Sequence, residues 1–220
     1  MKSAQLILSS GYALLAAALL PINTARADDF QPAGRGTFIV DLRASDVSPD
    51  TSDRIVTAAG ADSGLHIKVG DSVMPTLGFT YFLTDHIAVE AILGTTQHTI
   101  YADGGGASVK VHRTWVLPPV VALQYRPWPK ARISPYLGGG VNAMIYYGGD
   151  NANGFKVRLK DNVGGAIQAG ADYALKGPWT LNVDVKKIFV ETDAVINDGA
   201  LHSDVNLNPW VLSLGVGRRF

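Results

Sequence analysis

The amino-acid sequence predicts an all-β protein, an eight-stranded antiparallel up-and-down transmembrane β-barrel with short periplasmic turns and long extracellular loops. Three observations support this fold class. Apolar and polar residues alternate in short runs, the connections between runs alternate in length, and aromatic residues bound the apolar face of three runs at equal spacing. After the N-terminal segment, no stretch is continuously apolar enough for a spanning helix, so entry into a membrane would require a closed barrel.

The first 27 residues are expected to form a cleaved signal peptide. Lys2 precedes an apolar stretch from Leu6 to Leu20, and the small-residue pattern around Ala25 and Ala27 suits a cleavage site. A short membrane anchor is the alternative, but the apolar core is shorter than the roughly 20 residues that a spanning helix needs. The mature domain is therefore expected to cover residues 28–220.

Charge and cysteine content exclude several kinds of partner. Loss of Lys2 and Arg26 would leave 17 basic residues against 19 acidic ones, which gives no electrostatic case for nucleic acid. The sequence contains no cysteine, so disulfides and thiolate metal sites are ruled out.

Eight strands are expected from period-2 alternation between turn residues. They span residues of about 34–43, 73–83, 87–95, 115–125, 136–147, 162–173, 179–189 and 210–220. The segment 44–70 is expected to be a long polar loop, and 96–113 a flexible loop with its tip at Gly104, Gly105 and Gly106. Pro118 and Pro119 lie inside the fourth strand and predict a bulge or an interrupted ladder there.

The connections between these strands are long, short, long, short, long, short and long. Outer-membrane barrels show this asymmetry, whereas a soluble β-sandwich has no reason to sort its loops by length. The pattern places four long loops outside the cell and both mature termini in the periplasm. The expected location is the outer membrane of a Gram-negative cell.

Aromatic residues delimit the apolar faces of three strands. The members of each pair are ten positions apart, which at a tilt of about 40° corresponds to a rise of roughly 25 Å, the height of the apolar band of such barrels. The alternative is that aromatic residues favour the ends of any strand. Lys187 and Arg218 lie one step inside these ends, where their side chains could reach headgroups. The pairs expected to form two aromatic girdles are Trp115 with Tyr125, Trp179 with Phe189, and Trp210 with Phe220.

Three motifs carry a family resemblance: LPP at 117–119, PYLGGGVN at 135–142 and NPW at 208–210. Together they make the chain similar to the OmpW/AlkL family of small outer-membrane proteins over essentially the whole mature sequence. The resemblance implies insertion by the barrel-assembly machinery, which recognises a C-terminal aromatic such as Phe220. It also implies a narrow, largely hydrophobic lumen that passes small apolar solutes, with sideways exit into the membrane.

Strand direction and side-chain parity divide the residues expected to point inward into two layers. The first forms an upper apolar lumen open to the outside: Ile92, Val116, Pro118, Val120, Met144, Ile188 and Val211. The second forms a polar lumen floor that closes the straight path to the periplasm: Glu90, Gln124, Asn142, Gln168, Asp172, Asn182, Asp184 and Arg219. The sequence therefore predicts porin-like passive uptake of small hydrophobic molecules, with lateral exit near Pro118 and Pro119. The alternative for the apolar layer is simple packing in a barrel that serves as an anchor.

No catalytic, cofactor or metal site is expected. His202, Ser203 and Asp204 are triad residue types, but neighbours on an extended chain point to opposite faces and cannot form a triad. The glycines at 104–106 lack the residues that follow them in a phosphate-binding loop, and no histidine pair has ligand spacing. The alternative function is a non-transporting surface receptor or structural protein that acts through its extracellular loops. The expected partners are outer-membrane lipid, lipopolysaccharide, the barrel-assembly machinery and hydrophobic solutes.

Overall fold

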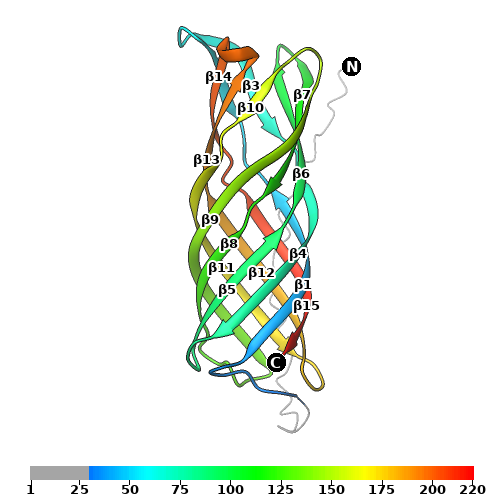
Figure 1. Cartoon of the computed structure of the whole chain (residues 1–220), viewed down its shortest axis with the longest axis vertical. Helices are drawn as coiled ribbons and strands as arrows, with labels where there is room; N and C mark the ends of the chain where they lie inside the picture. The colour runs from blue at the N-terminus through cyan, green and yellow to red at the C-terminus, as the bar shows by residue number, and fades with distance from the viewer. Residues whose placement is uncertain (1–29) are drawn as a thin grey trace, which may run out of the picture.

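The computed structural model describes residues 30–220, and the predicted signal peptide lies outside these described residues. This part of the chain is almost entirely β-structure (Figure 1), with one short 3-10 helix, η1 (Asn197–Gly199). Within residues 30–220, no helix is long and apolar enough to cross a membrane. The strands are β1 (Phe38–Ser48), β2 (Asp53–Thr57), β3 (Asp62–Val69), β4 (Ser72–Phe82), β5 (Ile87–Gly94), β6 (Thr96–Gly104), β7 (Ala107–Leu117), β8 (Val120–Tyr125), β9 (Ile133–Asn151), β10 (Val157–Leu159), β11 (Asn162–Ala174), β12 (Trp179–Phe189), β13 (Glu191–Ile196), β14 (Leu201–Asn206) and β15 (Trp210–Arg219).

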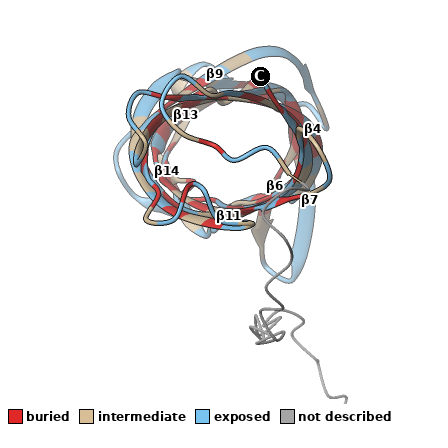
Figure 2. Cartoon of the chain, turned by 90° about the horizontal axis from the view of Figure 1, so that it is seen from below, coloured by how far each residue is buried: buried red, intermediate tan, exposed pale blue. Residues whose placement is uncertain are grey.

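Eight of these strands close into an antiparallel barrel, as the sequence predicts. Their order around the wall is β9, β11, β12, β15, β1, β4, β5 and β8, and pairing of β8 with β9 completes the ring. Figure 2 shows the strands encircling a central interior. At the closing seam Ala122 pairs with Gly140, and a Cβ on this glycine would lie 2.0 Å from the carbonyl oxygen of Val121. The seam therefore depends on a residue without a side chain.

The first barrel strand begins and ends later than the sequence predicts. Residues 34–37 form a turn in which the amide of Thr37 donates to the carbonyl of Gly34 at 2.9 Å, and β1 then continues to Ser48. The inward positions of β1 include Asp41, Arg43 and Ser45, all buried. Because this inward face is polar and is buried through hydrogen bonds and ion pairs, the alternation of apolar residues does not reveal that the strand continues to Ser48.

The prediction of irregular loops at 44–70 and 96–113 is wrong. The barrel wall continues beyond the aromatic residues at this end as hairpins, and its upper order is β10, β13, β14, β2, β3, β6, β7 and β9 (Figure 1). The β6–β7 hairpin turns at Gly105 and Gly106, both with positive φ, so the glycines do form the expected tip. Buried Ile55, Ile67 and Val111 line the inner side of these hairpins and belong to the main apolar core. Apolar burial therefore holds these segments as sheet.

Side chains separate by parity along the barrel strands. The apolar face that the sequence predicts to meet lipid is exposed, and its aromatic ends are exposed between 40% (Trp115) and 58% (Phe220). The Lys187 ammonium lies 4.9 Å from the Trp210 ring centroid, and the Arg218 guanidinium lies 5.0 Å from that of Phe220. A continuous apolar belt of this extent would be a liability in water. The outward residues at the aromatic ends are Trp115, Tyr125, Trp179, Phe189, Trp210 and Phe220.

The two ends of the described chain lie at the end of the barrel opposite the extended hairpins (Figure 1). Phe220 pairs with Phe38 through two backbone hydrogen bonds of 2.8 and 3.1 Å, and Phe30 bridges to Gly177 in the short β11–β12 turn. Short turns and chain ends are thus on one side, and long hairpins on the other, as the connection lengths predict.

Candidate solute cavity and polar floor

An apolar cavity occupies the upper half of the barrel and extends into the hairpins. The space in which the centre of a water molecule can lie is about 60 Å³, so the lumen is narrow. Its lining comes from strands far apart in the sequence, including β1, β4, β9, β12 and β15. The seven residues expected in the upper lumen all line it: Ile92, Val116, Pro118, Val120, Met144, Ile188 and Val211.

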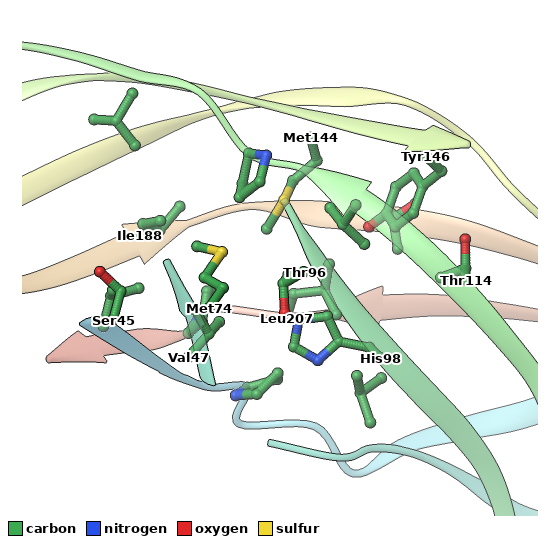
Figure 3. Close-up of a pocket in the computed structure, with 18 of the residues that line it drawn as sticks. Ser45, Val47, Met74, Thr96, His98, Thr114, Met144, Tyr146, Ile188 and Leu207 are labelled. Atoms are coloured by element: carbon green, nitrogen blue, oxygen red, sulfur yellow. The ribbon is translucent and has the colours of Figure 1, made fainter. Parts of the chain in front are cut away.

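Two methionines line the cavity from strands that are separated in the wall by β5 and β8. Met74 on β4 and Met144 on β9 both line it, and Figure 3 shows their side chains between Ser45 at one end and Tyr146 at the other. Methionine is unbranched and changes rotamer readily, so it can yield to guests of different shape.

Below the cavity lies a buried layer of charged and polar side chains. Arg43 Nη2 donates to Glu90 Oε1 at 2.7 Å, and Lys186 Nζ lies 3.3 Å from Glu90 Oε2. Arg43 also pairs with Asp41, and Lys186 with Asp184. Glu90 thus links two cations that each hold a second carboxylate.

A second cluster continues this layer across the barrel. Arg126 pairs with Asp172, and its Nη2 donates to Gln124 Oε1 at 2.7 Å. Asn182 Nδ2 donates to Asp172 Oδ1 at 2.8 Å and to the Tyr136 hydroxyl at 3.1 Å. That hydroxyl donates to Asp184 Oδ2 at 2.9 Å, which connects the two clusters. Every residue expected in the floor is buried: Glu90, Gln124, Asn142, Gln168, Asp172, Asn182, Asp184 and Arg219.

The sequence reasoning missed five members of this layer: Asp41, Arg43, Arg126, Tyr136 and Lys186. Lys186 could have been predicted from the alternation of side chains along the strand, because it lies two positions from Asp184 and two from Ile188, both of which are expected to point inward. Among residues 30–220 the buried acids Asp41, Glu90, Asp172 and Asp184 balance the buried bases Arg43, Arg126, Lys186 and Arg219. This balance allows the floor to be buried, because an unpaired charge there would be very costly.

The barrel wall is interrupted where the prolines predict. β7 ends at Leu117 and β8 begins at Val120. On the side of β5 and β6, the last pair of β7 is Val116 with Thr96 and the first pair of β8 is Val120 with Ile92, with no backbone pair between them. The side toward β9 is held, because the Pro119 carbonyl accepts from the Ala143 amide at 3.1 Å and from Asn142 Nδ2 at 3.0 Å. The weak side of the interruption therefore faces β5 and β6.

The other side of the β5–β6 junction is also weakly joined. The β4–β5 ladder ends where Thr76 pairs with Gly94, and β4 extends beyond it with Pro75, which has no backbone N–H. A side-chain bond from Thr96 Oγ1 to Ser72 Oγ at 2.7 Å crosses this gap. The wall around residue 95 is thus a part of the described barrel where backbone pairing lapses on both sides, and side-chain bonds from Thr95 to the Val116 carbonyl and from Thr96 to Ser72 cross the two gaps.

His98 is a buried titratable group at the upper part of the cavity, beyond the ring of Trp115. Its Nδ1 lies 2.7 Å from the Gly70 carbonyl oxygen. Desolvation by burial lowers the pKa of His98, and the bond to Gly70 opposes this only in part. Because the folded state binds the proton less readily than the unfolded state, stability falls as pH drops below the unfolded pKa of about 6.5.

The residues weighed as a catalytic triad are consecutive positions on β14. Ser203 Oγ donates to the Arg54 carbonyl at 2.9 Å, while His202 and Asp204 flank it on a strand. In the described range 30–220, no group of three or more histidine, cysteine, aspartate or glutamate side chains is placed to hold a metal ion.

The closed eight-stranded wall, its apolar exterior and its buried polar floor define the class: an outer-membrane β-barrel protein. The model of the OmpW family matches residues 34–220, and the chain belongs to that family. The protein therefore lies in the outer membrane and associates with its lipid, as the sequence predicts.

Relatives and solved structures agree with this assignment. The chain is 37% identical over 192 residues to an uncharacterized outer-membrane protein, y4mB, of Sinorhizobium fredii, covering 86% of this chain and 82% of the relative. It is 32% identical to outer membrane protein W of Vibrio cholerae, covering 84% and 89% respectively. The crystal structure of OprG from Pseudomonas aeruginosa matches with a TM-score of 0.81 at 29% identity, covering 87% of this chain and 99% of that one.

Proposed function

We propose that the protein is an outer-membrane channel for passive uptake of small hydrophobic molecules. The apolar cavity above a charge-balanced, buried floor is the observation that carries this proposal. An apolar solute would gain by leaving water for the cavity. It would meet a barrier at the floor, where passage requires separating buried ion pairs. The proposal assigns the protein no enzymatic role.

The exit we propose is lateral, through the wall around residue 95 into the bilayer. Supporting it, backbone pairing lapses there on both sides, and Pro75, Pro118 and Pro119 lack the N–H groups that would close the ladders. Val116, Pro118 and Val120 line the cavity at this level, so a solute would reach the interrupted wall around residue 95 before it reached the floor. In this proposal the protein has two further partners. Lipopolysaccharide surrounds the barrel in the membrane, and the barrel-assembly machinery recognises Phe220 during insertion.

The test is uptake of an apolar solute into proteoliposomes. Val120→Arg places a charged side chain in the cavity and should reduce uptake to the rate of protein-free vesicles. Ser108→Arg places the same charged side chain on the outer face of the β6–β7 hairpin, where Ser108 is exposed and pairs with Asp103, and should leave uptake unchanged. Equal uptake with and without the wild-type protein would refute the channel.

A surface receptor remains the alternative function, and deletion of the β2–β3 hairpin distinguishes the two. Charged residues such as Arg54 and Asp62 project from this hairpin into solvent, which suits partner binding. Its inner side, however, contributes Ile55 and Ile67 to the apolar core, and Ile67 lines the cavity. Loss of partner binding with uptake intact would favour the receptor.

A further inference from the structure

The lower end of the cavity is built from hydrogen-bonding side chains on four adjacent strands. Ser45 Oγ lies 2.8 Å from Thr76 Oγ1 and 2.8 Å from Ser213 Oγ, so three hydroxyls form a row across β4, β1 and β15. Lys186 lies on the next strand, β12, where it pairs with Val211, two positions from Ser213. All four side chains are at least 97% buried and line the cavity. We call Ser45, Thr76, Ser213 and Lys186 the donor row.

The donor row has more O–H and N–H hydrogens than it uses in hydrogen bonds to other protein groups. Two hydrogen bonds join its three hydroxyls and use two of the three O–H hydrogens, and within residues 30–220 these hydroxyls make no further hydrogen bond. Of the three N–H groups of Lys186, one donates to Asp184 and a second faces Glu90 at 3.3 Å. A buried donor without an acceptor is costly, so the row favours an occupant that accepts hydrogen bonds.

The rest of the lining limits what else that occupant can carry. Directly above the row the cavity is bounded by Val47, Met74, Met144, Ile188 and Val211, none of which offers a side-chain hydrogen bond of ordinary strength. Of the other polar lining residues, Thr96, His98, Thr114 and Thr192 already bond to protein oxygens, whereas the Tyr146 hydroxyl has no partner among the described residues and is a second donor at the other end of the cavity. The buried charges below already balance, so an anionic head group would add an uncompensated charge. A neutral oxygen on an apolar chain satisfies both conditions.

We infer that the cavity selects neutral hydrophobic molecules with a terminal oxygen acceptor, such as a ketone, ester or alcohol, and holds that oxygen against Ser45, Thr76, Ser213 and Lys186. The apolar chain then points up the lumen past Met74 and Met144 (Figure 3). This inference rests on the proposed function, since it names the solute class that the same cavity takes. A single neutral hydrogen bond should favour the oxygenated solute about three- to tenfold over the plain hydrocarbon.

The test uses undecan-2-one with a ¹³C carbonyl, and undecane, on the full-length protein in lipid vesicles. Infrared difference spectra should show a carbonyl band at lower wavenumber than in protein-free vesicles, because a hydrogen bond weakens the C=O bond. The triple variant Ser45→Ala, Thr76→Val and Ser213→Ala removes the hydroxyl row and should lose most of this band. Thr114→Val removes one hydroxyl at the other end of the cavity and should keep it.

Competition between the two probes gives a second readout. The ketone should displace undecane from the wild-type protein and from Thr114→Val with the stated preference, which should fall to about one in the triple variant. Heat-modifiable migration on gels verifies that each variant is folded. No shifted band in the wild type, or an equal band in the triple variant, would overturn the inference.

The rate at which the two probes cross the membrane is measured separately from the binding of the carbonyl at the donor row. Faster passage of both probes without a shifted band would leave the proposed channel in place and overturn the selectivity. A shifted band without faster passage would support the site and remove the transport function.

Discussion

Replacing Glu90 by glutamine removes one negative charge from the floor and leaves the shape of the side chain almost unchanged. Glu90 is 1% exposed and faces both Arg43 and Lys186. In the variant the buried bases outnumber the buried acids by one. Loss of one partner from a buried ion pair costs about 3–5 kcal/mol. Because Asp41 and Asp184 still hold the two cations, we expect the lower end, about 3 kcal/mol, which is more than a hundredfold in the unfolding equilibrium.

The assay is urea unfolding of the protein in lipid vesicles, followed by tryptophan fluorescence. With a slope of about 1–3 kcal/mol per molar urea, the midpoint of Glu90→Gln should fall by about 1–3 M. Glu191→Gln is the matched control, because Glu191 is exposed at the start of β13 and should shift the midpoint very little. If both variants unfolded at the wild-type midpoint, the floor would not be the stabilising layer described above.

Three further predictions concern other parts of the barrel. His98→Gln should weaken the loss of stability below about pH 6.5, measured as unfolding midpoint against pH; an unchanged profile would exclude His98 as its source. Leu214→Arg, at the middle of the outward face of β15, should cost about 2–4 kcal/mol in a bilayer, against about 0–1 for Ser108→Arg on the outer face of the β6–β7 hairpin; equal costs would argue against lipid at Leu214. Gly140→Ala should destabilise the closing seam by about 1–3 kcal/mol, whereas Gly139→Ala, whose Cβ would lie 3.7 Å from its nearest neighbour, should be tolerated; similar midpoints for the two would contradict a tight seam.

The outward half of the barrel could be predicted from the sequence because lipid-facing residues alternate with inward ones over whole strands. Trp179, Leu181 and Val183 show this on β12, where the predicted and observed bounds coincide. The interruption at Pro118 and Pro119 was also predictable, since a residue without an N–H cannot continue a ladder. These signals are local, and each depends only on residue type and spacing.

The inward half was only partly predictable. Asp41 and Arg43 are stable inside the barrel because they pair with each other on β1 and because Arg43 also pairs with Glu90. Glu90 comes from another strand, β5, so this pairing exists only in the closed barrel. The hairpins were missed for a similar reason. Ile55, Ile67 and Val111 are separated by polar residues, and their common apolar core exists only after β2, β3 and β7 pair into one wall.

Uptake of an apolar solute by a pair of tryptophan variants at adjacent positions tests the channel most directly. Val120 is 4% exposed and lines the cavity, whereas Val121 is 49% exposed on the outer face of the same strand. Val120→Trp should fill the narrow lumen and bring proteoliposome uptake down to that of empty vesicles, while Val121→Trp, with its ring in lipid, should match the wild type. Equal uptake by the two folded variants would contradict passage of the solute through the barrel interior.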